Sequence, residues 1–211
     1  MIAIIFNIKR GIEDSETGTG EAGNMRYPAS ETAKKHDKIL KQAARLFRER
    51  GFDGAGVAEI MTAAGLTHGA FYAHFPSKDV LEAEAVDRAF AQSARRVYAL
   101  TANAGDAKQA FLDSYLSGAH RDRPGTGCAM AALGPEIARE SAARKPFTQG
   151  VKHMLDGMVR RFRWKRKGSE RGNAIHLLSA AVGALILARA VDDPQLSDEI
   201  LESVRDGLTS L

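Results

Sequence analysis

Residues 57–75 read VAEIMTAAGLTHGAFYAHF, and PSKDVL follows them directly. The apolar residues between Val57 and Met61 recur at the i, i+3, i+4 spacing of a helix with one apolar side. Gly65 then supplies a residue that tolerates positive φ, which a sharp turn between two helices commonly needs. Thr67 is a residue type that caps the N-terminus of a helix well. The stretch therefore predicts two short helices with a turn at Gly65.

The second of these helices has two different sides. Its apolar residues predict a side that packs against the protein core: Ala70, Phe71 and Phe75. The opposite side combines polar residues with a glycine: His68, Gly69, Tyr72 and His74. The helix is too short, and too polar at its start, to be an ordinary core helix. This arrangement is typical of a helix-turn-helix, in which the second helix offers its N-terminal side chains to the DNA major groove.

The segment AAGLTHGAFYAHFPSKDVL resembles the DNA-binding signature of the TetR (tetracycline-repressor-like) family of bacterial transcriptional regulators. In that family a hydroxyl residue, a polar or basic residue and a glycine open the recognition helix. An aromatic pair, a His-Phe pair and a lysine follow. The residues of this chain that match are Thr67, His68, Gly69, Phe71, Tyr72, His74, Phe75 and Lys78. The resemblance covers roughly residues 34–82, and GALILARAVDDPQLSDEIL resembles the C-terminal region of one TetR subgroup.

The resemblance implies which residues of the recognition helix contact DNA. Thr67 and His68 are expected where the helix enters the groove, and His68 would contact a base edge or a phosphate. Gly69 would let the backbone approach the DNA closely. Tyr72 and His74 would form hydrogen bonds with phosphates. The alternative for these last two residues is that they are structural elements of a three-helix core.

Lysines on two other helices are further candidates for phosphate contacts. Lys78 opens the next helix, where its ammonium and the N-terminal amides would bind one phosphate together. Lys34, Lys35 and Lys38 lie on the first helix, whose N-terminal end approaches the DNA backbone in related proteins. Residues 34–50 contain seven Lys/Arg and two acidic residues, a local balance of +5. Ordinary surface charge is the alternative interpretation for each lysine of the first helix.

The composition fits a globular protein with a sizeable core. The chain has 211 residues, of which 44% are hydrophobic and 27% charged, and its formal net charge is +4. This mild positive charge is compatible with a polyanionic partner. The single cysteine excludes an internal disulfide framework and suits a reducing compartment.

The sequence also predicts a cytoplasmic protein. Polar residues interrupt the longest apolar run, 174–191, so that no run reaches the roughly 18–20 residues that cross a bilayer. The run instead predicts a buried helix. The first nine residues make a poor signal peptide, because no basic region precedes them and no cleavage pattern follows.

No pattern in the chain predicts a metal, a cofactor or a catalytic site. The six histidines never stand with Cys or acidic residues at metal-ligand spacing. Residues 125–127 are rich in glycine, but no Gly-Lys-Ser/Thr follows them, so they are not a P-loop. No nucleophile, base and orienting group can be assembled, which argues against an enzyme.

The sequence predicts an all-α protein in three parts. Residues 1–24 include a Gly-, Thr- and acid-rich stretch and are expected to be a disordered N-terminal extension. Met25 would make a natural start for a TetR-like protein, so we hypothesise that the extension is optional. Residues 25–80 are expected to form a three-helix, helix-turn-helix DNA-binding domain, and residues 81–211 a helical effector-binding and dimerisation domain. The helices predicted after the recognition helix cover 78–100, 108–119, 130–141, 147–164, 171–191 and 197–209.

In TetR-like proteins the middle helices enclose an effector pocket. In this chain that region has apolar and soft side chains, most of them at helical spacing. The candidate pocket residues are Phe111, Tyr115, Cys128, Met130, Phe147, Met154 and Met158. Plain core packing is the alternative interpretation for each. No arginine or carboxylate that would orient a ligand is identifiable, so the chemistry of the effector stays open.

These features predict a DNA-binding regulator, usually a repressor, that binds a pseudo-palindromic double-stranded operator as a homodimer. The two recognition helices would lie one DNA turn apart, roughly 34–36 Å, or a multiple of that distance. The resemblance to the TetR family further implies that a small-molecule effector among the middle helices would shift the dimer to a spacing that no longer fits DNA. The last two helices would pair with those of the partner through Leu177, Leu178, Val182, Leu185, Ile186, Ile200, Leu201 and Val204. Small residues would permit close approach there: Ala180, Ala181, Gly183 and Ala184.

Two segments allow alternative interpretations. Cys128 follows a glycine-rich loop and precedes a predicted helix, whose dipole would favour a reactive thiol. The chain would then be a redox-responsive DNA-binding regulator, whereas a buried inert thiol is the simpler interpretation. The basic run 160–171, RRFRWKRKGSER, could bind nucleic acid with Phe162 and Trp164 stacking on bases. The simpler interpretation is a solvated helix end whose cations complement the helix dipole.

Overall fold

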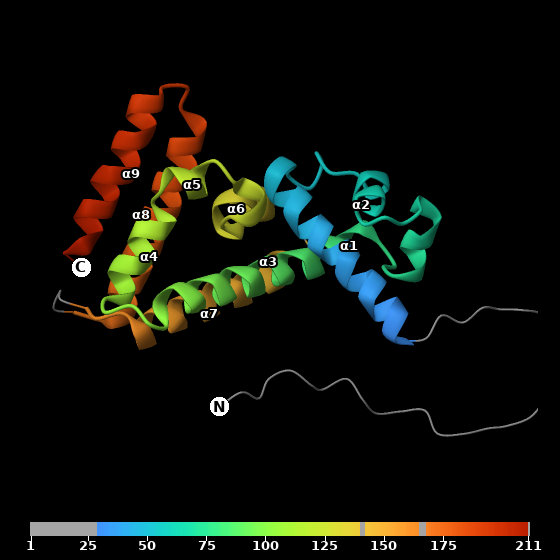
Figure 1. The fold of residues 1–211 in the computed structure, drawn as a ribbon, viewed down its shortest axis with the longest axis horizontal. Helices are drawn as coiled ribbons and strands as arrows, with labels where there is room; N and C mark the ends of the chain where they lie inside the picture. The colour runs from blue at the N-terminus through green and yellow to red at the C-terminus, as the bar shows by residue number, and fades with distance from the viewer. Residues whose placement is uncertain (1–28, 140–141, 165–167, 211) are drawn as a thin grey trace, which may run out of the picture.

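The computed structural model describes residues 29–139, 142–164 and 168–210, and every regular element among them is a helix. The elements are α1 (Ala29–Arg50), α2 (Val57–Ala63), η1 (His68–Ala73), α3 (Lys78–Thr101), α4 (Ala107–Tyr115), α5 (Gly118–Arg121), η2 (Pro124–Thr126), α6 (Ala129–Arg139), α7 (Arg144–Arg161), α8 (Glu170–Ala190) and α9 (Pro194–Thr209). In Figure 1, α1 and α2 lie toward one end of the molecule and α8 and α9 at the other. The prediction of an all-α protein is confirmed for these residues. The extension predicted over 1–24 lies outside them.

α1 and α2 form because each places apolar residues against the same core. In α1 the buried apolar residues are Ile39, Ala43, Ala44, Leu46 and Phe47. α1 ends at Gly51, which has a φ of 78° and whose amide donates to the Phe47 carbonyl at 2.8 Å. After a short turn, α2 buries Ile60 and Met61. Gly65 has a φ of 71°, which confirms the predicted turn.

The recognition segment is a 3-10 helix rather than a turn of α-helix. η1 covers six residues, His68–Ala73, and Thr67 occupies its N-cap position without a side-chain capping hydrogen bond. A segment this short, with a glycine inside it and Pro76 soon after it, gains too few hydrogen bonds to sustain an α-helix. Phe71 and Phe75 anchor it, since both are buried and their ring centroids lie 5.8 Å apart.

α3 connects the helix-turn-helix to the rest of the molecule. Ser77 caps it, because Ser77 Oγ accepts a hydrogen bond from the Val80 amide at 3.3 Å. α1 packs across α3 between Glu84 and Gln92, and α7 packs along α3 (Figure 1). The buried apolar residues described form one cluster that includes side chains from α1 to α9. The two predicted domains therefore share a core.

The single helix predicted over 108–119 is two helices. α4 ends at Tyr115, and Leu116 leaves the helical conformation with a φ of −95° and a ψ of 55°. Ser117 then caps α5, which begins at Gly118. The break falls at this Ser-Gly pair because a serine side chain competes for backbone hydrogen bonds and a glycine weakens a helix interior. The loop predicted next contains η2.

α8 and α9 pack against each other at one end of the molecule (Figure 1). Asp193 caps α9, since its Oδ1 accepts from the amides of Gln195 at 2.9 Å and Leu196 at 3.2 Å. Among the described helices, α8 is the one long and apolar enough to cross a bilayer. Helices in a protein core are often as long and apolar. Eight residues of α8 are buried, in agreement with the buried helix predicted here.

Much of the predicted pairing surface on α8 and α9 is not available to a partner. Six of its residues are buried within the subunit: Leu177, Leu178, Ala181, Ala184, Leu185 and Leu201. The other six are half-buried: Ala180, Val182, Gly183, Ile186, Ile200 and Val204. The exposed large apolar residues of these helices lie outside the prediction: Ile175, Leu187 and Leu196. α8 is apolar around most of its circumference, so its sequence does not reveal which side faces its own subunit.

We expect Gly65→Ala to lower the free energy of unfolding by about 1 kcal/mol, because an L-residue is strained at positive φ. A Cβ at Gly65 would meet nothing within 4 Å, so steric overlap does not contribute. Gly69→Ala is the matched control, since its Cβ also meets nothing and its φ is not positive. Urea denaturation of both variants checks this expectation, and equal losses of stability would contradict it.

Candidate nucleic-acid interface and ligand cavity

The start of η1 is exposed to solvent. Thr67, His68 and Gly69 are exposed, and Tyr72 is 72% exposed. The Tyr72 ring lies edge-on to the buried Phe71 ring, with 5.1 Å between their centroids. Four of the residues predicted to contact DNA therefore lie on the surface above a packed aromatic base.

His74 lies partly inside the molecule. Its Nδ1 is buried and has no hydrogen-bond partner within the described residues. Burial lowers the pKa of His74, and the nearby charges of His36 and Lys35 lower it further. The His36 ring stacks on Phe75 at 4.4 Å, and its Nε2 lies 3.0 Å from Glu84 Oε2. His74 thus belongs in part to the core, and its contact with a phosphate stays a prediction.

α1 brings positive charge close to the end of η1. Lys34 and Lys38 are exposed, whereas Lys35 is half-buried and pairs with Glu31 at 3.3 Å. A shallow hollow separates the first half of α1 from the end of η1. It is lined by Thr32, Ala33, His36, Asp37, Ala73 and His74. The first half of α1, which carries these lysines, and the end of η1 therefore border one hollow, and contact of the lysines with a DNA backbone stays a prediction.

Lys78 has partners inside the protein. Its Nζ donates to the Phe52 carbonyl at 2.6 Å and lies 3.7 Å from Glu82 Oε1. Its side chain is 33% exposed. Lys78 therefore holds the start of α3 to the turn after α1, a role that the sequence does not reveal. A phosphate contact by the same ammonium stays a prediction.

Arg48 and the Phe52 amide join the end of α1 and the turn after it to the Gly125 loop and to α6 by hydrogen bonds. Arg48 is buried and donates to the Gly125 carbonyl from Nε at 2.9 Å and from Nη2 at 2.6 Å. Its Nη2 also donates to Gln92 Oε1 at 3.0 Å, and burial lowers the pKa of Arg48 to about 10. The Phe52 amide donates to Glu136 Oε2 of α6 at 2.8 Å. A displacement of the Gly125 loop or of α6 would therefore be transmitted to the end of α1.

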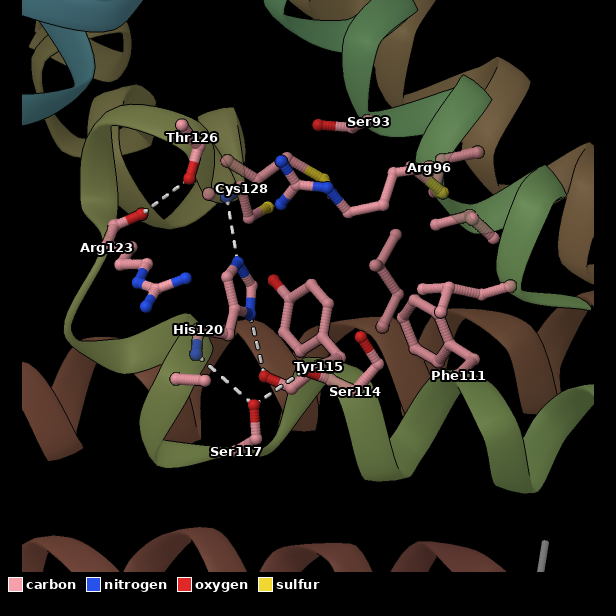
Figure 2. Close-up of a pocket in the computed structure, with 17 residues that line it drawn as sticks. Ser93, Arg96, Phe111, Ser114, Tyr115, Ser117, His120, Arg123, Thr126 and Cys128 are labelled. Carbon is pink, nitrogen blue, oxygen red and sulfur yellow. Dashed lines mark hydrogen bonds between the residues drawn. The ribbon is translucent and has the colours of Figure 1, made fainter.

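A cavity of about 260 Å³ lies among α3, α4, α6, α7, α8 and the loop that precedes α6 (Figure 2). Five of the seven predicted pocket residues line it: Phe111, Tyr115, Cys128, Met130 and Met154. Phe147 does not, because its ring packs edge-on against Phe90 at 5.5 Å. Met158 lines a separate hollow of about 60 Å³. α7 packs on both α3 and α8, so helical spacing does not reveal which of its apolar residues face the cavity.

The cavity also has polar residues that the sequence analysis missed: Ser93, Arg96, Ser114, Ser117, His120, Arg123 and Thr126. The sequence analysis identified no arginine for this region, and the structure places Arg96 and Arg123 in the cavity lining. Arg96 extends from α3 toward Cys128 (Figure 2). Arg95 and Arg96 stand side by side in the sequence, and only the position of α3 against its neighbours distinguishes them.

His120 fixes the loop that lines one end of the cavity. Its Nε2 lies 3.1 Å from the Cys128 amide and accepts its hydrogen, so its Nδ1 carries the proton and donates to the Tyr115 carbonyl at 2.7 Å. Burial lowers the pKa of His120, with the charges of Arg189 and Arg96 adding to the effect. The imidazole is therefore neutral, and both of its nitrogens are occupied by the backbone.

Cys128 lies immediately before α6 and is 5% exposed. This burial agrees with the interpretation of an inert thiol. The residue nonetheless lines the cavity, so a small reagent that enters there would meet it. Within the described residues, no group of three His, Cys, Asp or Glu side chains could hold a metal ion.

The basic run over 160–171 has its first aromatic residue inside the protein. Phe162 is buried, and the Arg161 guanidinium lies over the Tyr98 ring at 4.7 Å from its centroid. A buried ring cannot stack on a base, so the helix-end interpretation is favoured over nucleic-acid binding. Residues 165–167 of this run lie outside the described residues.

Comparison with known proteins finds a family match within the N-terminal half of the chain. Residues 39–85 match the model of the bacterial regulatory proteins, tetR family. The HTH-type transcriptional repressor DhaR of Mycobacterium sp. (strain GP1) is 25% identical over 100 residues, which are 47% of this chain and 50% of DhaR. The HTH-type transcriptional regulator YerO of Bacillus subtilis (strain 168), described as uncharacterized, is 43% identical over 47 residues, 22% of this chain and 16% of YerO. These matches span half or less of the relatives' own length.

Solved structures extend the similarity of fold to most of the chain. E. coli NemR in its reduced form has a TM-score of 0.71 at 21% identity, over 84% of this chain and 96% of NemR. A TetR-family regulator from Cytophaga hutchinsonii has a TM-score of 0.72 at 19% identity, over 88% of this chain and 98% of its own. The relatives are named as transcriptional regulators and not as enzymes, in agreement with the sequence analysis. Residues 39–85 are thus similar to the helix-turn-helix region of the tetR family, and the helical body behind them shares the fold of solved TetR-family regulators.

Proposed function

We propose that the chain is a homodimeric DNA-binding repressor that leaves its operator when a small molecule occupies the cavity. The observation that carries this proposal is the exposed start of η1. Thr67, His68, Gly69 and Tyr72 stand on the surface while Phe71 beneath them is buried. Such a rigid, outward-facing segment is what insertion into a major groove requires.

The contacts between the two halves support control by a ligand. The cavity and the Arg48 contact share the loop before α6, since Gly125 accepts from Arg48 and Thr126 and Cys128 line the cavity. A ligand that binds one loop position better than another shifts the population of the whole molecule. The end of α1, and with it the spacing of two recognition segments in a dimer, would change with that shift.

The named relatives and the DNA target support a direction of regulation and a location of the protein in the cell. DhaR is named a transcriptional repressor, which supports the same sense of regulation here. A regulator that binds operator DNA acts in the cytoplasm, at the nucleoid. The proposed division of labour is DNA binding by residues 25–80 and effector binding and dimerisation by residues 81–211.

We propose that two copies pair through the exposed sides of α8 and α9. Ile175 is 45% exposed, Leu187 56% and Leu196 41%. Gly183 lies between the first two on α8, and a Cβ there would meet nothing within 4 Å of its own subunit. Large apolar side chains around a small residue favour close packing of a second helix.

The DNA-binding role is tested by Lys38→Ala and His68→Ala. Loss of one phosphate contact is expected to weaken binding to all sequences equally and to reduce the log-salt slope by about one for Lys38→Ala. His68→Ala is expected to change sequence preference instead. Mobility shifts at several salt concentrations, on genomic fragments that the protein itself selects, measure both effects.

Lys152→Ala is the matched control, because Lys152 is an exposed lysine on α7, away from η1. Lys78→Ala is expected to reduce the salt slope as well and to lower the free energy of unfolding, since the Phe52 carbonyl loses its donor. If Lys38→Ala, Lys78→Ala and His68→Ala each bound DNA as the wild type does, the proposed contact of η1, α1 and α3 with DNA would be refuted.

Leu187→Glu is expected to shift the protein from dimer to monomer, because a carboxylate would be buried in the pairing surface. Ala99→Glu adds the same charge at an exposed position of α3 and serves as control. Sedimentation velocity of the two variants measures the outcome. A dimer that tolerates Leu187→Glu unchanged would place the interface elsewhere.

A redox-responsive regulator is the alternative, and the position of Cys128 in the cavity is the observation that favours it. We expect peroxide to leave DNA binding unchanged in the wild type and in Cys128→Ser, because the thiol is 5% exposed. Mobility shifts before and after peroxide treatment check this. Release of the wild type but not of Cys128→Ser would establish the alternative.

A further inference from the structure

The charges that line the cavity are all of one sign. Its 17 lining residues include Arg96 and Arg123 but no Asp or Glu. Within the described part of the chain, neither arginine has a carboxylate at ion-pair distance. Two acidic residues lie near the Gly125 loop and form ion pairs with other arginines: Glu49 binds Arg45 at 2.7 Å, and Asp122 binds Arg121 at 2.7 Å. Asp122 also interacts electrostatically with Arg123 and Arg189, but not at ion-pair distance.

Further cations stand behind the cavity wall. Arg48 donates to the Gly125 carbonyl, and Arg189 donates to the carbonyls of Arg121 at 3.0 Å and His120 at 2.9 Å. Both guanidinium groups lie close enough to interact electrostatically with Cys128. The end of the cavity near Cys128 is therefore a region of positive potential, which attracts an anion and repels a cation.

A buried hydroxyl group, that of Tyr115, lies at the end of the cavity near Cys128. The Tyr115 hydroxyl points toward the Cys128 thiol, and it makes no hydrogen bond to an oxygen or nitrogen within the described residues (Figure 2). Burial raises the pKa of Tyr115, and the neighbouring Cys128 raises it further, so the group carries its proton and can donate it. A thiol is a weak acceptor, so a ligand oxygen would satisfy the hydroxyl better. His120 cannot compete for that ligand, because the backbone occupies both of its nitrogens.

The cavity also has a large apolar lining, which includes Val97, Leu100, Phe111, Met154 and Leu178. Figure 2 shows Phe111 on the side away from Arg123 and Thr126. The volume of about 260 Å³ is just below the range of roughly 300–1,000 Å³ usual for ligand pockets.

We propose that the effector is a small organic anion with an apolar body. Its anionic group lies between Arg96, Arg123 and the Tyr115 hydroxyl, and its body lies against Phe111 and Leu178. A carboxylate accepts two parallel hydrogen bonds from a guanidinium, which gives direction as well as affinity. The assignment rests on the proposed function, because it names the chemical class of the ligand that this cavity takes.

Matched pairs of probes test the charge of the ligand. Naphthoate and naphthamide have the same ring body, and decanoate and decanamide the same chain body, while one member of each pair is neutral. Calorimetric titration of the full chain is expected to show at least one of the acids binding at least tenfold more tightly than its amide, in line with the strength of a charged hydrogen bond.

Arginine variants test the position of the charge. Arg96→Gln and Arg123→Gln are each expected to reduce the affinity for the acid about tenfold and to leave that for the amide unchanged. Arg95→Gln is the matched control, since Arg95 is an exposed arginine of α3 like Arg96 but does not line the cavity. Thermal unfolding of the unliganded variants verifies that they are folded.

Three results would overturn the assignment: amides that bind as tightly as the acids, acids that bind Arg96→Gln and Arg123→Gln as tightly as the wild type, or no binding by either acid. A mobility shift on the same samples separates this failure from that of the proposed function. DNA binding that an amide releases as readily as its acid would leave the regulator intact and refute the anion. Tight, arginine-dependent binding of the acid by a chain that never binds DNA would support the anion and refute the proposed regulator.

Discussion

The buried guanidinium of Arg48 holds the loop before α6 through the Gly125 carbonyl. Removing a cation from water costs several kcal/mol unless hydrogen bonds compensate for the lost hydration. Here a main-chain carbonyl and the Gln92 amide oxygen bind Nε and Nη2, while the buried Nη1 has no partner within the described residues. These acceptors serve only while the loop keeps its position. The contact thus makes the last turn of α1 sensitive to the loop that lines the cavity.

The peptide groups of Phe52 reinforce this link. The Phe52 amide donates to Glu136 on α6, and its carbonyl accepts from Lys78 on α3. Both helices therefore bind the turn that positions α2 and η1. The recognition segment itself contributes little regular hydrogen bonding, because it is a short 3-10 helix. Its orientation depends on the packing of Phe71 and Phe75, and so on the same core that surrounds α1.

The cavity combines a histidine held by the backbone with two arginines that form no ion pair among the described side chains. His120 is bound to the backbone on both sides of the α5 region, and the proposed ligand would bind Arg96, Arg123 and the Tyr115 hydroxyl. In the proposed regulation, the cavity and the helix-turn-helix are connected over a short path, since Gly125 and Cys128 are three positions apart. The proposed regulation needs a small movement of one loop rather than a rearrangement of the fold.

The sequence by itself determined the all-α class, the turn at Gly65 and the exposed residues of the recognition segment, because helical spacing and glycine conformation are local properties. The charge that lines a cavity and the side of a helix that faces solvent are not local properties. Only the tertiary structure separated Arg96 from Arg95, gave Lys78 an internal acceptor and assigned half of the predicted pairing residues of α8 and α9 to the core of their own subunit. It also decided that η1 is 3-10 and that the predicted helix over 108–119 breaks at Leu116. Each of these depends on which helices meet in space, and that is set by contacts between residues far apart in the chain.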